Sequence, residues 1–229
     1  MSRHFLVPLH EEGWRFVAIF AAVSVLLGLL VWSSFYWIGA AATLWCAYFF
    51  RDPPRMTPQR VGLIVSPADG LVHSVGPAVP PLELDLPAAP MTRVSIFLSI
   101  FDVHIQRVPA DGSIDVVAYH PGQFISATND KSSELNERSS VSMTLQDGQR
   151  LVLVQIAGAI ARRIRNDLKP QQAVLAGTRY GLIRFGSRVD LYLPEGVAPL
   201  VCAGQRAIGG ETIIADLHAD DAPRQGQER

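Results

Sequence analysis

The amino-acid sequence contains one long uncharged apolar stretch, which runs from Phe16 to Phe50. None of these 35 residues is Asp, Glu, Lys or Arg, and 29 of them are hydrophobic. A single helix of this length would measure about 52 Å, whereas the hydrocarbon core of a bilayer is about 30 Å thick. One straight helix is therefore too long, and a chain with such a segment is not a fully soluble protein.

The middle of this stretch is suited to a fold-back. Residues 32–37 read Trp-Ser-Ser-Phe-Tyr-Trp, so aromatic side chains typical of membrane interfaces surround two serines. We expect two short helices, 14–31 and 35–50, that form a membrane hairpin. A single span or a helix lying in the interface remains the alternative. A cleaved signal peptide is disfavoured because the apolar core is too long and acidic residues precede it.

The flanking arginines predict an orientation. Arg15 lies at the outer end of the first helix, and Arg51, Arg55 and Arg60 follow the second, so a hairpin leaves all four on one side. The positive-inside rule makes that side cytoplasmic. We therefore expect membrane anchorage with the rest of the chain on the cytoplasmic face.

The other 194 residues carry all 41 charged side chains and have the composition of one soluble domain. A net charge of −1 gives no case for nucleic-acid binding. The two cysteines, Cys46 and Cys202, show no metal-ligand spacing and fit a reducing compartment.

Short apolar runs broken by turn residues follow the stretch, which is typical of a mostly β domain. The predicted strands are Gly62–Ser66, Leu71–Val75, Arg93–Ile100, Ile114–Tyr119, Val141–Leu145, Arg150–Ile156, Gly181–Phe185, Val189–Leu193 and Thr212–Ala215. Helix signals are weaker, with one turn expected at Ser133–Arg138 and a short helix at Gly158–Leu168. We expect an arm at 1–13, the hairpin at 14–50, a proline-bearing linker at 51–60, a mostly β domain at 61–216 and a flexible tail at 217–229.

Three positions could carry chemistry. His104 lies where an apolar strand gives way to polar residues, Asp69 lies in a Ser-Pro-Ala-Asp-Gly turn, and a Gly186-Ser187 dipeptide separates two β-type runs. Taken alone, each also has an ordinary structural explanation as a surface histidine, a turn aspartate or a bulge. No His or Cys pair has the spacing of a metal site.

Several motifs, taken in order, resemble one family. They are Phe-Phe-Arg-Asp-Pro-Pro-Arg at 49–55, Ser-Pro-Ala-Asp-Gly at 66–70, Phe-Asp-Val-His at 101–104, Tyr-His-Pro-Gly at 119–122, Asp-Lys at 130–131 with Asn-Glu-Arg at 136–138, Gln-Ile-Ala-Gly at 155–158 with Ile-Ala-Arg-Arg-Ile at 160–164, and Gly-Leu-Ile-Arg-Phe-Gly-Ser-Arg-Val-Asp at 181–190. Together they resemble the short, membrane-associated form of phosphatidylserine decarboxylase between Phe49 and Ala215.

This resemblance implies a proenzyme that cuts itself between Gly186 and Ser187 into a β chain, 1–186, and an α chain, 187–229. Ser187 would be the nucleophile and become a pyruvoyl group, with His104 as general base and acid and Asp69 orienting it. The pyruvoyl ketone would form a Schiff base with phosphatidylserine in the membrane and release carbon dioxide, giving phosphatidylethanolamine. No metal and no pyridoxal phosphate would be needed, and a homo-oligomer stays open.

One departure from the long forms of the family matters. They carry His-x-x-His where this chain has His104 but Arg107. We expect His104 to serve both self-cleavage and proton transfer, with His120 as the alternative. Candidate contacts to the lipid phosphate are Arg107, His120, Gln123, Phe124, Lys131, Arg162 and Arg163.

Two other functions remain as alternatives. The first is a pyruvoyl-dependent decarboxylase of a soluble amino acid, which would have no reason for a membrane anchor. The second is a membrane-anchored binding module of the lipoyl or biotinyl type, because 204–214 together with 66–72 resembles the paired hairpins of those domains. The modification-site lysine of such carriers is missing, so we take this likeness as a fold prediction: a β-sandwich or barrel-like domain of the α+β class, mostly β.

Overall fold

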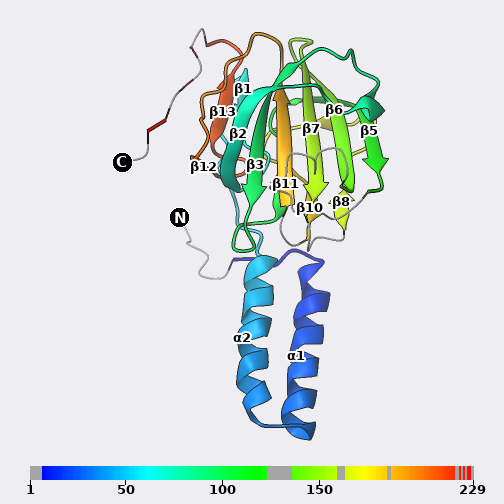
Figure 1. Ribbon diagram of the computed structural model, residues 1–229, viewed down its shortest axis with the longest axis vertical. Coiled ribbons are helices and arrows are strands. Elements are labelled where there is room, and N and C mark those ends of the chain that lie inside the picture. The colour runs from blue at the N-terminus through cyan, green and yellow to red at the C-terminus, as the bar shows by residue number, and fades with distance from the viewer. Residues whose placement is uncertain are drawn as a thin grey trace. The chain divides into compact units, whose positions relative to one another are not determined.

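The computed structural model describes residues 7–122, 136–158, 163–184, 187–219, 222, 224, 226 and 227. The chain forms two compact units, Met1–Pro54 and Arg55–Arg229 (Figure 1). The contacts that hold each unit together lie within that unit.

The first unit is a helical hairpin, as the sequence predicts. Helix α1 spans Gly13–Leu30 and α2 spans Ser34–Phe49. The two helices approach closely at small residues, since a Cβ added to Gly39 would lie 1.9 Å from Ser24 Oγ. The open end is closed by stacked Phe16 and Phe50 rings, whose centroids lie 5.3 Å apart.

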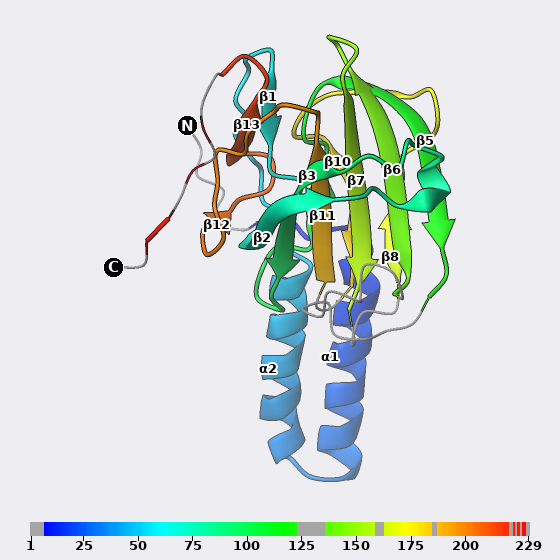
Figure 2. The same ribbon diagram turned by 45° about the horizontal axis from the view of Figure 1, so that its top comes forward.

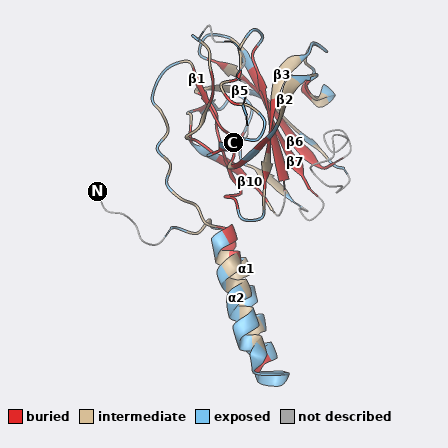
Figure 3. Cartoon of the chain, turned by 60° about the vertical axis from the view of Figure 1, so that its left-hand side comes forward, coloured by how far each residue is buried: buried red, intermediate tan, exposed pale blue. Residues whose placement is uncertain are grey.

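Helix α1 is long and apolar enough to cross a membrane, with a mean hydropathy of 2.0. Its 18 residues rise about 27 Å. Helix α2 has 16 residues, so it rises only about 24 Å. Exposed residues lie along much of both helices (Figure 3). Whether both helices span stays a prediction.

The second unit is mostly β, with one large curled sheet (Figure 2). Its eight strands follow the order β12-β2-β3-β11-β7-β6-β5-β9. Their bounds are β2 Gly70–Ala78, β3 Met91–Leu98, β5 Gly112–His120, β6 Arg138–Leu145, β7 Arg150–Ala157, β9 Ala173–Val174, β11 Ser187–Leu193 and β12 Arg206–Ala207. Two smaller antiparallel sheets complete the unit: β4 (Ile105–Arg107), β10 (Arg179–Ile183) and β8 (Ile164–Asn166) in the order β4-β10-β8, and β1 (Leu63–Val65) with β13 (Ile213–Asp216).

The core lies between the large sheet and the smaller ones, which gives the predicted sandwich-like arrangement. Alternate residues of β11 show why: Val189, Leu191 and Leu193 are fully buried in the main hydrophobic cluster. Ile64 of β1 and Ile183 of β10 join that cluster from the opposite side. The period-2 pattern of the strands therefore buries one face of the large sheet.

All nine predicted strands are present, with ends that differ by up to three residues. The short strands β4, β8, β9 and β12 were not predicted because two or three residues carry no periodic signal. The helix predicted at Gly158–Leu168 is wrong over its described part: Ile164–Asn166 forms β8, whose backbone pairs with β10. The turn predicted at Ser133–Arg138 lies outside the described residues up to 135, and β6 begins at Arg138.

Strands from the last 43 residues are interleaved with strands from earlier in the chain. Strand β11 pairs with β3 on one side and β7 on the other, β12 pairs with β2, and β13 pairs with β1. The segment after Gly186 is therefore held in the unit by the backbone hydrogen bonds of its three strands, β11, β12 and β13. The two lipoyl-like hairpins also meet as predicted, with Ala207 opposite Gly70.

The outer face of the large sheet is partly covered by the short 3₁₀ helix η1, Leu82–Leu84. Glu83 receives two hydrogen bonds from the Arg138 guanidinium, at 2.6 and 2.8 Å, and one from Ser140 Oγ at 2.8 Å. Burial alone raises the pKa of Glu83, but the hydrogen bonds from Arg138 and Ser140 outweigh it and lower the pKa to about 2. This carboxylate fastens η1 to β6.

Replacing this carboxylate by an amide should lower stability in a pH-dependent way. The folded-state pKa of Glu83 lies below its ordinary value of 4.5, so its stabilisation is complete above pH 4.5 and is lost as the pH falls towards 2. We expect Glu83→Gln to lower the melting temperature at pH 7 by about 3 °C or more. Thermal unfolding of the full chain in detergent, measured between pH 3 and 7, tests this. The exposed Glu195→Gln is the control, and a Glu83→Gln deficit that stays constant with pH would contradict the assignment.

Candidate active site

Ser187 is the first residue of the central strand β11 and is fully buried. It lies opposite Leu98, the last residue of β3, and Ala157, the last residue of β7. Among the described residues, its hydroxyl has no hydrogen-bond partner. Strand alternation directs it to the same face as the buried Val189. The structure thus holds an unsatisfied serine hydroxyl at the end of three neighbouring strands.

His104 is fully buried just before β4. Its Nδ1 lies 2.9 Å from the carbonyl oxygen of Asp102. A carbonyl oxygen can only accept, so Nδ1 carries the proton and, in a neutral ring, Nε2 is the basic nitrogen. The His104 carbonyl oxygen also accepts a hydrogen bond from Ile183 N at 3.3 Å. Ile183 lies four positions before Ser187, a stretch of chain that spans at most about 14 Å, so the His104 backbone is bonded to the segment that leads into the serine.

Two buried glutamines connect this histidine to the large sheet. Gln106 donates through Nε2 to the His104 carbonyl oxygen at 2.9 Å, and Gln155 donates to Gln106 Oε1 at 3.0 Å. Gln155 lies on β7 directly opposite Val189 of β11. Buried amides need such partners. This chain of hydrogen bonds fixes the His104 backbone against the strand pair that carries Ser187.

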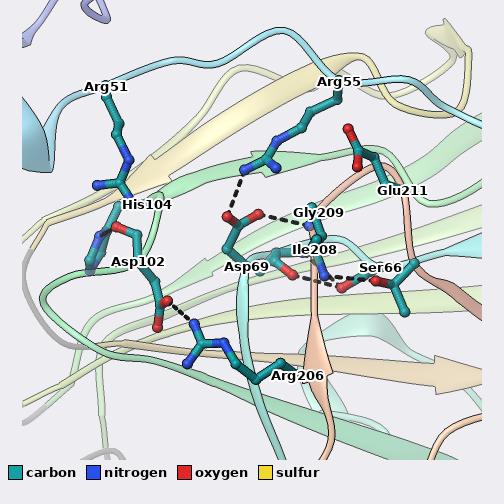
Figure 4. A network of polar contacts seen from close by, with 12 residues as sticks. Arg51, Arg55, Ser66, Asp69, Asp102, His104, Arg206, Ile208, Gly209 and Glu211 are labelled. Atoms are coloured by element: carbon teal, nitrogen blue, oxygen red, sulfur yellow. Dashed lines mark hydrogen bonds and ion pairs between the residues drawn. The ribbon is translucent and has the colours of Figure 1, made fainter. Parts of the chain in front are cut away.

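Asp69 lies in the turn between β1 and β2. Its Oδ1 accepts a hydrogen bond from Gly209 N at 2.8 Å, and its Oδ2 lies 2.6 Å from Arg55 Nη2 (Figure 4). Ser66 Oγ donates to the Ala68 carbonyl oxygen inside the turn at 2.7 Å. The backbone at Gly209 lies so close to this turn that a Cβ added to Gly209 would be 3.1 Å from the Ala68 carbonyl carbon.

Backbone contacts bring the Asp69 turn beside the His104 strand. Arg107 N donates to the Pro67 carbonyl oxygen at 2.9 Å. Burial raises the pKa of Asp69, the Arg55 charge and the hydrogen bonds from Gly209 and Arg55 oppose this rise, and the charge of Asp102 adds to it. The two aspartates are therefore electrostatic neighbours.

Asp102 is a site residue that sequence reasoning missed. Its Oδ2 accepts a hydrogen bond from Ser99 N at 2.8 Å, and its Oδ1 pairs with Arg206 (Figure 4). The side chain thus fixes the loop whose carbonyl orients His104. Its position two residues before the histidine was visible in the sequence, but its carbonyl contact and its distant partner were not.

The proposed phosphate contacts are not all near Ser187. Arg107 is buried, and its Nη1 donates to the Gly177 carbonyl oxygen at 2.8 Å. His120 ends β5, three strands from β11 and therefore about 14 Å along the sheet. Arg163 is exposed, and its carbonyl oxygen accepts a hydrogen bond from Arg184 N at 3.3 Å, three residues before Ser187. Of these candidates, Arg163 is the one beside the serine segment.

Five predicted site residues lie outside the described part of the chain: Gln123, Phe124, Lys131, Arg162 and Gly186. Within the described ranges, no group of three or more His, Cys, Asp or Glu side chains is arranged to hold a metal ion. The roles of all these residues stay predictions.

The fold and the site together define a class of protein. It is a mostly β domain behind an apolar helical hairpin, with a buried serine, a buried histidine and a buried aspartate turn gathered around one sheet end.

Comparison with known proteins identifies the family. Residues 42–215 match the family model described as phosphatidylserine decarboxylase. The chain is 54% identical over all 229 residues to a protein named phosphatidylserine decarboxylase proenzyme from Paramagnetospirillum magneticum, covering 95% of that protein. It is also 54% identical over its full length to the proenzyme of the same name from Cereibacter sphaeroides, covering 98% of it, and 53% identical over 217 residues to that of Ruegeria pomeroyi, covering 95% of this chain and 99% of that protein.

The chain therefore belongs to the phosphatidylserine decarboxylase family and is an enzyme of the decarboxylase class.

Substitution of Asp102 should weaken the loop that carries His104. Asp102→Ala removes the acceptors of Ser99 N and Arg206, and each lost hydrogen bond costs about 0.5–1.5 kcal/mol. Asp102→Asn keeps a carbonyl oxygen for Ser99 N and should be milder. Decarboxylase rate and melting temperature should both fall in the order wild type, Asn, Ala, and equal rates in all three would rule out a role for this side chain.

Proposed function

We propose that this chain is a proenzyme that cuts itself between Gly186 and Ser187 and then decarboxylates phosphatidylserine to phosphatidylethanolamine with a pyruvoyl group made from Ser187. The observation that carries the proposal is the fully buried Ser187 hydroxyl, which has no hydrogen-bond partner among the described residues. Most buried hydroxyls in folded proteins find a hydrogen-bond partner, and among the described serines Ser187 shares the exception with Ser95 of β3. If the Ser187 hydroxyl is lost during self-cleavage, its lack of a partner means that no hydrogen bond of the fold is broken.

Self-cleavage needs a base for the serine. An unactivated hydroxyl is a poor nucleophile and requires a neighbouring base together with a group that orients the base. His104 supplies the base through Nε2, because its Nδ1 proton is held by the Asp102 carbonyl. In this proposal Asp69, whose turn is bonded to β4 directly after the histidine, supplies a negative charge that would favour the protonated ring.

The atoms of the self-cleavage reaction balance when one water molecule is consumed. The Ser187 oxygen attacks the Gly186 carbonyl carbon, the peptide C–N bond breaks, and an ester joins the two residues. Loss of the Ser187 α-proton then expels the Gly186 carboxylate and leaves a double bond at residue 187. Water hydrolyses the resulting imine, releasing ammonia and leaving a ketone at the new chain end. The hydroxyl that disappears is one that no described residue uses.

The pyruvoyl group, once formed, supplies a carbonyl that takes up the substrate amine and accepts electrons as carbon dioxide leaves. The chain's own task is to hold that chain end and to return a proton. The ladders to β3 and β7 hold the first residue of β11 from both sides. His104 returns the proton to the substrate carbon, because an imidazole can both donate and accept a proton.

A lipid substrate explains the helical hairpin of the first unit. Helix α1 is apolar enough to enter a bilayer, and the flanking arginines favour the cytoplasmic side. Arg163, exposed and bonded to the segment before Ser187, is the described candidate for the lipid phosphate. We place the reaction at the cytoplasmic surface of the inner membrane.

Cleavage should be visible as two chains that stay together. Under denaturing conditions the purified protein should give chains of 186 and 43 residues, the smaller blocked to N-terminal sequencing because it begins with a ketone. Without denaturant they should co-elute, since β11, β12 and β13 pair with strands of the larger chain. Ser187→Ala should remain one chain of 25.0 kDa without decarboxylase activity. A stable single chain in an active wild-type preparation would refute the proposal.

The two roles of His104 can be separated by assay. We expect His104→Ala to slow self-cleavage by about 100-fold or more, the usual contribution of a general base. Any chain that does mature should release carbon dioxide correspondingly slowly. Gel densitometry measures the first step and labelled carbon dioxide the second. The exposed His73→Ala is the matched histidine control, and a normal rate of both steps in His104→Ala would move the base elsewhere.

A further inference from the structure

Arg55 is the first residue after the two prolines that follow the helical hairpin. Its guanidinium Nη2 lies 2.6 Å from Asp69 Oδ2, and the two side chains are only 13% and 15% exposed (Figure 4). At this exposure water does little to screen the pair. Removal of either partner would therefore leave a poorly solvated charge.

The residues after Arg55 are also fixed to the catalytic unit. Met56 N donates to Glu211 Oε1 at 3.0 Å. Thr57 Oγ1 lies so near Gly177 that a Cβ added to Gly177 would be 2.0 Å from this oxygen. Residues 55–57 are thus bonded to or packed against the second unit, although the sequence suggested a simple spacer at 51–60.

The charged groups around Asp69 come from three other elements. Arg55 comes from the linker, Asp102 from the loop between β3 and β4, and Glu211 from the chain between β12 and β13. Arg206 pairs with Asp102, and the carbonyl of Asp102 holds the His104 ring. Arg55 is the cation that touches the Asp69 carboxylate directly.

We propose that Arg55 is a positioning residue for self-cleavage, which fixes the Asp69 carboxylate in place and makes the linker part of the catalytic unit. The inference rests on the proposed function, in which Asp69 orients the base. One oxygen of the carboxylate is held by Gly209 N and the other by Arg55. With the second contact gone, the carboxylate keeps a single anchor and is free to turn about it.

The charge of Arg55 matters as well as its geometry. Burial raises the pKa of Asp69, and the Arg55 charge is the largest influence that opposes this rise. Because a carboxylate acts here only when ionised, activity is lost as the pH falls through its pKa. Removing Arg55 therefore raises the pKa of Asp69, so that the loss of activity on the acid side (the acid limb of the pH profile) begins at a higher pH.

The test compares three full-length variants. Arg55→Gln removes the charge, Arg55→Lys keeps the charge without the planar fork, and Arg60→Gln is the control. Arg60 also pairs across the chain, with Asp216, but its side chain is 58% exposed and the pair lies outside the network around Asp69. Each proenzyme is made by cell-free synthesis in detergent, and the rate of appearance of the 43-residue chain is measured by gel at several pH values, together with the melting temperature.

We expect Arg55→Gln to cut itself about tenfold or more slowly at pH 7, with an acid limb at higher pH than wild type. Arg55→Lys should recover part of the self-cleavage rate and part of the wild-type pH dependence. Arg60→Gln should match wild type. In an Asp69→Asn background, Arg55→Gln should cause no further loss of rate.

Three results would overturn the inference. These are a wild-type rate and pH profile in Arg55→Gln, an equal slowing at every pH with a lower melting temperature, or a full additional loss in the Asp69→Asn background. If Arg55→Gln does not fold, Arg55→Lys is judged by the same criteria. Absence of cleavage in the wild type itself would instead refute the proposed function, so the two failures are distinct.

Discussion

Strand β11 is the constraint on which the rest of the structure depends. It occupies the middle of the eight-stranded sheet, so its backbone groups bond to β3 and β7, and all seven of its residues are buried. A strand satisfied on both edges cannot shift register without breaking two ladders. The serine at its start is therefore held in one place relative to the ends of β3 and β7. That rigidity is what a reactive chain end requires if the backbone before it is cut.

The polar site is assembled across the Gly186/Ser187 position. His104, Asp102 and Asp69 come before it in the chain, whereas Gly209 and Arg206, which hold the two aspartates, come after it. Cleavage would not separate these groups, because β12 and β13 pair with β2 and β1. The C-terminal segment thus contributes more than the serine. It also fixes the carboxylates around the histidine.

The linker residues after the proline pair belong to the second unit. Arg55, Met56 and Thr57 are bonded to or packed against other residues of that unit. A linker fixed in this way suits the proposed reaction, whose lipid substrate would lie in a bilayer that helix α1 is long and apolar enough to cross. In that reaction Arg55 would supply a cation to the Asp69 carboxylate.

Local patterns in the sequence were enough for the helical hairpin and for nine of the thirteen described strands, because hydrophobic periodicity and turn chemistry are short-range signals. The roles of Ser187, His104 and Asp69 rest on family motifs and stay predictions. Local patterns failed for β8, taken as part of a helix, whose three residues are extended because they bond to β10. They also could not show that Asp102 fixes the loop of His104, or that Arg55 and Gly209 share one carboxylate. Arg55 and Gly209 lie 14 and 140 positions from Asp69, and only the fold brings such distant backbone and side-chain groups within hydrogen-bonding distance.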